Sequence, residues 1–123
     1  MASALPHRPA VDYTPTDRTD VEIRDDDTGD IIQAMSSAMA QDLLAALDDE
    51  PSTASGLADA VGASLQNTKY HLDQLCEAGL VEGVDTWYSS RGAEMTVYAL
   101  SIQRLVVRLG ETGHDGTSDR TGE

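Results

Sequence analysis

The sequence predicts a single α+β domain in which several short helices precede a β-hairpin. Between residues 31 and 76, apolar residues recur at spacings of three and four, which is typical of amphipathic helices. From residue 81 the spacing changes to two, which is typical of strands. A chain of 123 residues, 40% of them apolar, has room for one small core and flanking segments. This length excludes a large enzyme or a receptor with a separate sensor domain.

The two ends of the chain are poor in residues that could form a core. Residues 1–27 hold three prolines and an acidic run that ends at Asp27, so we expect a flexible acidic N-terminal arm. Val21 and Ile23 alternate with charged residues, and a short edge strand there is the alternative. Residues 110–123 contain no large apolar residue, and we expect a disordered C-terminal tail. The folded domain is therefore predicted to span residues 28–109.

Two helices are predicted in the first half of this domain. One apolar stripe has helical spacing through Ile31, Ile32, Met35, Met39, Leu43, Leu44 and Leu47. Asp27 or Thr28 can cap its start, because their side chains accept hydrogen bonds from free N–H groups. Ser36-Ser37 can interrupt the stripe and cap a second helix, which Pro51 stops.

Two more helices follow at close spacing. The third begins near Thr53 and ends at Gly62, a residue suited to the left-handed end of a helix. Ser64 can cap the fourth helix, and Gly79 ends it. Two short helices joined by a turn that contains Gly form a helix-turn-helix pattern.

A β-hairpin is predicted after the helix-turn-helix. Residues 81–89 and 95–100 alternate as strands do, and Ser90–Ala93 form the turn between them. A helix-turn-helix followed by a hairpin is a winged helix-turn-helix. Ile102, Leu105, Val106 and Leu109 then recur at helical spacing, which predicts a short terminal helix over residues 102–109. A strand through Leu105–Val107 is the alternative.

The charge balance is strongly acidic. Acids outnumber Lys and Arg by 22 to 8, the formal net charge is −14, and Lys69 is the only lysine. An acid excess with almost no lysine resembles cytosolic proteins of salt-loving archaea, whose surfaces stay hydrated and mutually repulsive in molar salt. An ordinary acidic protein with disordered tails is the alternative.

Several segments of this sequence resemble a known family. The resemblance covers Ala34–Ser37, Leu43–Leu47, Leu57–Gly62, Ser64–Leu72, Leu75–Val81 and Trp87–Gly92. In these stretches the chain is similar to the ArsR-like winged helix-turn-helix transcriptional regulators, and to their haloarchaeal branch in particular. The His-Leu pair followed by Ala-Gly-Leu-Val is the most specific part. The resemblance implies a homodimer that binds double-stranded operator DNA and regulates transcription.

The residues of the predicted fourth helix suit this role. In a helix-turn-helix the N-terminal half of the second helix faces base edges in the major groove. Candidate DNA-binding residues are Ser64, Gln66, Asn67, Lys69, Tyr70, His71 and, at the hairpin tip, Arg91. Gln and Asn can pair with adenine, Lys can meet a phosphate or guanine, and Tyr can donate to a phosphate. Residues 60–72 and 86–93 contain no acid, so phosphate can approach them.

A dimer seam is predicted at the first and last helices of the domain. Both carry more apolar surface than a core of this size needs, and a partner must cover it. The predicted seam residues are Ile31, Ile32, Met35, Ile102, Leu105, Val106 and Leu109.

Other functions find less support. There is no glycine-rich phosphate loop, nucleophile elbow or zinc signature, so we expect no enzyme, cofactor, metal or small-molecule ligand. Cys76, the single cysteine, excludes an internal disulfide and is expected to be a core residue. No apolar stretch reaches the roughly 20 residues that span a bilayer, and residues 1–10 lack a signal-peptide core, so we expect a cytoplasmic protein without membrane contact. The alternative function is a winged-helix protein–protein interaction module with an acidic docking face.

Overall fold

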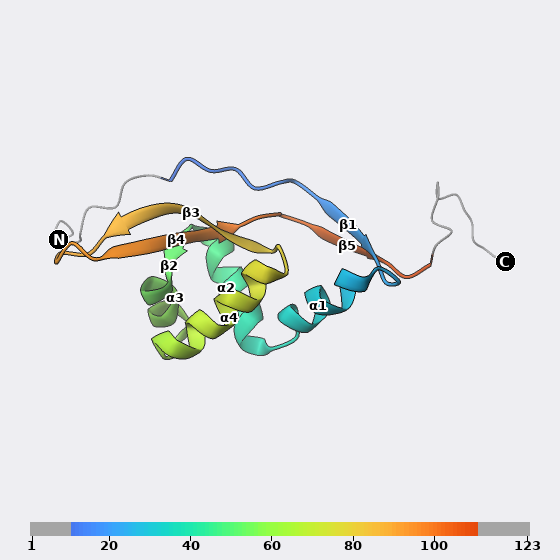
Figure 1. Ribbon diagram of the computed structural model, residues 1–123, viewed down its shortest axis with the longest axis horizontal. Coiled ribbons are helices and arrows are strands. Elements are labelled where there is room, and N and C mark those ends of the chain that lie inside the picture. Colours follow the sequence, from blue (N-terminus) through green and yellow to red (C-terminus); the bar gives the residue numbers. More distant parts are fainter. Residues whose placement is uncertain (1–10, 111–123) are drawn as a thin grey trace.

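The protein forms four helices and five strands in a computed structural model that describes residues 11–110. All the strands lie along one side of the molecule and all the helices lie on the other (Figure 1). In chain order the elements are β1 (Thr19–Glu22), α1 (Asp26–Met35), α2 (Ala38–Asp49), β2 (Ser52–Thr53), α3 (Ala54–Val61), α4 (Leu65–Glu77), β3 (Val81–Tyr88), β4 (Glu94–Leu100) and β5 (Leu105–Arg108). This order confirms the α+β winged helix-turn-helix prediction.

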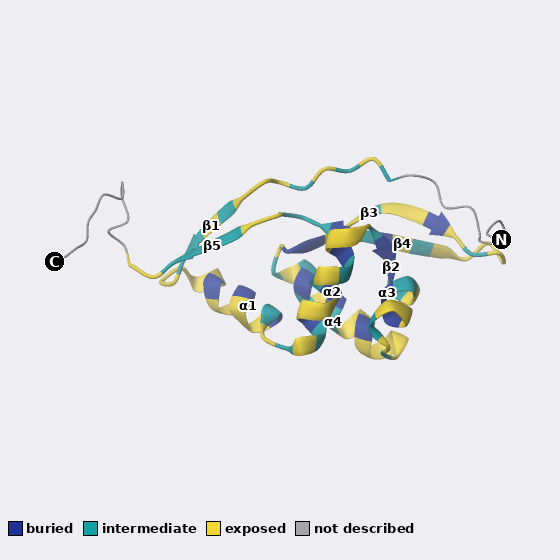
Figure 2. Cartoon of the chain, turned by 180° about the vertical axis from the view of Figure 1, so that it is seen from behind, coloured by how far each residue is buried: buried dark blue, intermediate teal, exposed yellow. Residues whose placement is uncertain are grey.

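The helices bury their apolar stripes against one another and against the inner face of the strands. Leu43, Leu57, Leu72 and Leu75 are at most 1% exposed and come from α2, α3 and α4. Figure 2 shows buried and exposed residues alternating along the helices, as expected when one face of each helix lies in the core. The stripes predicted from spacing therefore form one core.

The hairpin β3–β4 is the wing, and β2 adds a third, antiparallel strand in the order β2-β4-β3. The sequence did not predict β2. The register between β3 and β4 shifts between Gly83 and Asp85. A side chain at Gly83 would come within 2.8 Å of the Thr96 methyl group, so the close strand contact here needs glycine.

Helix α1 begins at Asp26, two residues before the predicted start of the domain at residue 28. Asp25 is its N-cap residue, so the caps predicted at Asp27 and Thr28 were wrong. Thr28 is fully buried, and its hydroxyl donates a hydrogen bond to the Glu22 carbonyl oxygen at the end of β1. Spacing and residue type within residues 25–35 do not predict this contact with β1. The predicted start of α1 was therefore too late in the chain.

The terminal helix predicted over residues 102–109 was wrong, and the strand alternative is correct. Leu105–Arg108 form β5, which pairs in parallel with β1. The apolar residues of β5 fit both spacings, and the distant partner strand decides between them. The described part of the expected N-terminal arm likewise contributes β1, as the edge-strand alternative at Val21 proposed. The predicted tail lies outside the described residues except for Gly110.

No helix among residues 11–110 is long and apolar enough to cross a membrane.

Candidate nucleic-acid interface

The helix-turn-helix consists of α3, a tight turn and α4. Gly62 ends α3 in the left-handed region at φ 71°, and the Ala63 N–H donates to the Ala58 carbonyl oxygen at 3.0 Å. Ser64 then begins α4, and its hydroxyl accepts a hydrogen bond from the Asn67 N–H at 3.0 Å. Both ends of the turn are thus held by the bonds that the sequence predicted.

Helix α4 has a buried face and an exposed face. Thr68, Leu72 and Leu75 are fully buried and fix the rotation of the helix about its axis. The candidate DNA-binding residues of its first two turns are all exposed: Gln66, Asn67, Lys69 and Tyr70. The helix therefore presents these four side chains outward from a rigid base.

His71 differs from its neighbours on α4. It is half-buried, and its ring lies edge-on to the exposed Tyr70 ring, with centroids 5.2 Å apart. Tyr70 is 58% exposed, so this contact orients the phenol without removing it from solvent. The pair is suited to positioning Tyr70 at the surface of α4.

A cleft separates the start of α3, the first half of α4 and strand β4. Lys69 lines it from α4, and Glu94 lines it from the start of β4, next to the wing tip. The remaining lining residues are Thr53, Ala54, Ser55, Leu65, Met95, Thr96 and Tyr98. Sequence reasoning missed Glu94, because the start of β4 and α4 border one cleft only in the folded chain.

The wing tip is a short, internally bonded loop that carries Arg91. The Ser89 hydroxyl accepts hydrogen bonds from the N–H groups of Arg91 at 3.2 Å and Ala93 at 3.0 Å. Gly92 adopts φ 83°, which closes the turn. Arg91 is exposed at the tip, so the loop backbone is held while the guanidinium faces solvent.

The cations of the described residues fall into two groups. Lys69 lies on α4, and Arg91 lies at the wing tip. The other four cations lie in or beside the β1–β5 sheet: Arg18, Arg24, Arg104 and Arg108. Local sequence patterns do not predict this second group, because its members are far apart in the chain.

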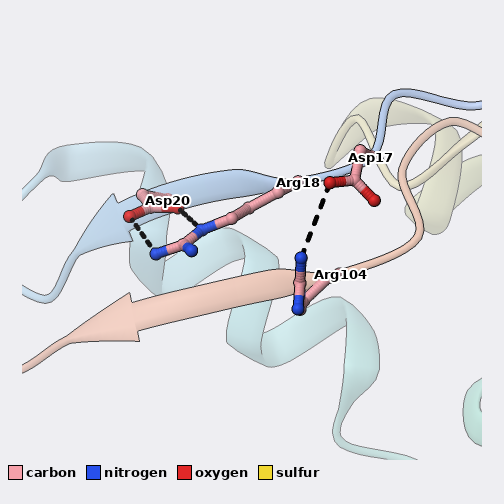
Figure 3. A network of polar contacts seen from close by, with 4 residues as sticks. All are labelled: Asp17, Arg18, Asp20 and Arg104. Atoms are coloured by element: carbon pink, nitrogen blue, oxygen red, sulfur yellow. Dashed lines mark hydrogen bonds and ion pairs between the residues drawn. The ribbon is translucent and has the colours of Figure 1, made fainter.

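Two arginines of the second group, Arg18 and Arg104, pair with acids (Figure 3). Arg18 donates two hydrogen bonds to Asp20, at 2.7 and 3.1 Å, and Arg104 lies 3.5 Å from Asp17. The Arg18 hydrogen bond holds the pKa of the Asp20 carboxyl below its usual value. In each of these exposed pairs the positive charge of the arginine is balanced by the negative charge of the aspartate. Such surface ion pairs add little to the stability of the fold.

Cys76 is half-buried against the core. Burial raises the pKa of its thiol, and the charges of Asp73 and Glu82 raise it further. A raised pKa keeps the thiol protonated and weakly nucleophilic at neutral pH. Within residues 11–110, no three His, Cys, Asp or Glu side chains come together as they would to hold a metal ion.

The predicted dimer residues do not share one surface. Ile31 is buried in the core of the chain, whereas Ile32 is 42% exposed and Leu109 is 77% exposed. The other four are half-buried: Met35, Ile102, Leu105 and Val106. Because side chains alternate along a strand, Leu105 and Val106 point to opposite faces of β5.

Comparison with known proteins gives three results. A family model described as a helix-turn-helix domain matches residues 35–84, which run from the end of α1 into β3. No curated protein matches the sequence. Two similar solved structures come from mycobacteria.

The first is the homodimeric winged helix-turn-helix DNA-binding domain of a possible ArsR-family transcriptional regulator from Mycobacterium bovis. It is 20% identical, with a TM-score of 0.51, and the match covers 62% of this chain and 65% of that one. The second is the cadmium metal sensor CMTR from Mycobacterium tuberculosis, which is 27% identical, with a TM-score of 0.45 and coverage of 59% and 70%.

These comparisons identify the unit that carries the candidate interface. The matched residues 35–84 include α3, the turn, α4 and the first part of the wing, so the chain contains a helix-turn-helix domain. The first solved structure shows the same winged-helix fold. Helix-turn-helix domains of this kind are DNA-binding units and not enzymes.

Proposed function

We propose that this chain is a sequence-specific DNA-binding transcriptional regulator of the ArsR-like type that acts as a homodimer. One observation carries the proposal: α4 presents Gln66, Asn67, Lys69 and Tyr70 to solvent, from a face that no other element within residues 11–110 covers. Its buried face is fixed in the core, so the exposed side chains hold a defined orientation. An element built this way fits the major groove.

The chemistry of α4 suggests how bases are read. The Gln66 and Asn67 amides can each form two hydrogen bonds with an adenine edge, and Lys69 can contact guanine or a phosphate. Tyr70 can donate its hydroxyl to a phosphate, with His71 orienting its ring. The N-terminus of α4, where Ser64 is exposed, adds a partial positive charge toward the same backbone.

The wing supplies the second contact. Arg91 stands exposed on a loop whose backbone is held by Ser89, so it can reach the minor groove or the phosphates beside the α4 site. Lys69 and Arg91 are the only cations on α4 and the wing among the described residues. Base contacts from amides therefore matter more here than in a strongly basic regulator.

A homodimer would present two α4 helices to one duplex. Two recognition helices read half-sites that lie one helical turn, or about 34–36 Å, apart. The similar domain from Mycobacterium bovis is described as homodimeric, which supports the same assembly here. We expect an operator with two related half-sites.

The haloarchaeal type is part of the proposal. Support comes from the net charge of −14 and the single lysine. An acidic surface of this kind stays hydrated in concentrated salt. Such a regulator would work in the cytoplasm, in contact with the chromosome.

Footprinting and gel-shift assays in molar potassium salt test the proposal, with sites first found by genome-wide occupancy. Lys69→Gln removes one positive charge from α4 and should reduce affinity for the specific site about tenfold, the loss of one good base or phosphate contact. Ala45→Glu makes the same change in net charge on the exposed surface of α2 and should leave affinity nearly unchanged. Equal effects of the two variants, or no specific site at all, would contradict DNA reading by α4.

A protein–protein interaction module is the second candidate, and the net charge of −14 favours it. An acidic face would dock a basic partner, and Lys69→Gln would then leave chromosomal occupancy unchanged. The occupancy map therefore separates the two functions.

A further inference from the structure

Strand β5 has an open edge. The N–H groups of Thr19 and Ile23 on β1 donate to the carbonyl oxygens of Arg104 and Arg108, at 2.9 and 2.8 Å. Backbone groups alternate in direction along a strand, so those of Leu105 and Val107 point away from β1. In the described part of the chain, β5 pairs with no other strand, and these groups have no ladder partner.

The outer edge of β1, in contrast, is closed at Glu22. The Glu22 N–H donates to the Asp25 carboxylate at 3.3 Å, and its carbonyl oxygen accepts from the Asp25 N–H at 2.9 Å. The Thr28 hydroxyl donates to the same oxygen. The chain therefore blocks one edge of the β1–β5 sheet with its own residues and leaves the β5 edge available.

A parallel sheet of only two strands, such as β1–β5, is unusual in a folded protein. Parallel sheets normally have more strands and are covered on both faces, and two-stranded sheets are marginally stable in water. All four residues of β5 are only half-buried, and Leu109 directly after it is 77% exposed. Ile23, at the same end of the sheet, is 44% exposed. The sheet has the features of one that is completed by another strand.

The charge of this sheet suits a second copy of the same chain. Residues 16–25 and 101–110 contain Arg18, Arg24, Arg104 and Arg108 against Asp17, Asp20, Glu22 and Asp25, so four positive charges balance four negative charges. The whole chain carries −14. Two copies repel each other over most of their surfaces, and here they can approach without that repulsion.

We propose that β5 pairs antiparallel with β5 of a second copy, which forms a four-stranded sheet in the order β1-β5-β5-β1. This inference deepens the proposed homodimer by assigning its interface to a strand edge. The backbone groups of Leu105 and Val107 that point away from β1 then gain ladder partners. The end of the sheet near Leu109 is covered at the same time.

The side chains select one register. A twofold axis perpendicular to the sheet places one residue of β5 opposite the same residue of the second copy. At the centre of β5, this residue is Val106 or Val107. Centring on Val106 sets Arg104 directly opposite the partner's Arg108, which is destabilising. Centring on Val107 sets Leu105 opposite the partner's Leu109 and covers that exposed leucine. The dyad is therefore at Val107.

This arrangement also suits DNA binding. All helices lie on one side of the strands (Figure 1). A twofold axis perpendicular to the shared sheet keeps both helical layers on the same side. Both α4 helices are then available to one duplex.

A proline at the open edge tests the interface. Val107→Pro removes the outward N–H of β5, while the N–H groups that bond to β1 belong to other residues. Light scattering without DNA should give a dimer for the wild type and for Val107→Ala, and a monomer for Val107→Pro, with unchanged helical circular dichroism. A monomeric wild type, or a Val107→Pro variant that stays dimeric, would overturn the proposal. Because no DNA is present, this outcome is independent of whether the chain reads DNA.

Cysteine cross-linking tests the register, in a Cys76→Ser background. In the proposed register two copies of residue 107 form a hydrogen-bonded pair with Cα atoms about 5.5 Å apart, within the range of a disulfide. Val107→Cys should cross-link on mild oxidation at least tenfold faster than the matched variant Val106→Cys, whose copies lie diagonally apart. Faster cross-linking at residue 106, or none at either position, would overturn the Val107 register.

Discussion

The Ser64 hydroxyl accepts a hydrogen bond from the Asn67 N–H at 3.0 Å, so the cap of α4 is bonded directly to a proposed base-reading residue. This bond satisfies one of the free N–H groups at the start of the helix. It also holds the first turn of α4 in the orientation that Gln66 and Asn67 need. Stability of the helix start and DNA recognition are therefore linked at this point.

Removing the cap should weaken both properties. We expect Ser64→Ala to lower the free energy of unfolding by about 1 kcal/mol, since the Asn67 N–H loses its partner. Affinity for specific DNA should fall as well, because the first turn frays. Urea unfolding and gel shifts measure the two effects. Ser64→Asn keeps an accepting side chain and should retain both, and equal losses in the two variants would contradict the capping role.

Neutralising Glu94 should strengthen DNA binding. This carboxylate lines the same cleft as Lys69, where it opposes an approaching phosphate. We expect Glu94→Gln to lower the dissociation constant about threefold, the size of an exposed charge interaction. Asp42→Asn on the exposed surface of α2 makes the same change in net charge and should have a much smaller effect. An equal gain in both variants would mean that only the total charge matters.

The salt dependence of DNA binding should be shallow or even reversed. Ordinary regulators lose affinity in salt because each neutralised phosphate releases counterions. Lys69 and Arg91 provide two candidate phosphate contacts in each copy, beside many carboxylates that can take up cations. Titrations at several potassium concentrations measure the slope. A steep loss, typical of six or more phosphate contacts, would contradict the prediction.

Alkaline pH should loosen the contact between the N-terminal segment and the wing. Tyr13 donates its hydroxyl to Glu82 on β3, and this bond raises the pKa of Tyr13 from 10.0 to about 12. A raised pKa in the folded state means that the contribution is fully present below pH 10 and is lost as pH rises toward 12. Unfolding measured across this range should show a larger loss in the wild type than in Tyr13→Phe. Tyr98, whose pKa burial also raises, remains in both proteins, so its contribution cancels in the comparison.

Local signals in the sequence were sufficient to predict the helix-turn-helix. Ser37, Thr53 and Ser64 each accept a hydrogen bond from an N–H three residues on, and Gly62 takes the left-handed conformation. These interactions join residues close in the chain, so spacing and residue type reveal them. The exposed face of α4 followed from the same spacing, because the buried positions set the rotation of the helix.

Long-range pairing was beyond local signals. The spacing of Ile102, Leu105, Val106 and Leu109 fits a helix, but β1 provides a strand partner for the same residues. Likewise, Thr28 looked like a cap and instead bonds to the end of β1. The acid at Glu94 beside α4 and the four arginines around β1 and β5 depend on strand register, which the sequence alone did not fix.

The pairing of Thr19 with Leu105 also bears on how the chain is made. During synthesis β1 leaves the ribosome long before β5, and everything from α1 to β4 emerges between them. The helical core can thus close while β1 still lacks its complement, since nearby contacts form faster than distant ones. Two copies can pair through β5 only after translation has passed residue 108, where β5 ends. Assembly of the dimer would therefore be the last step.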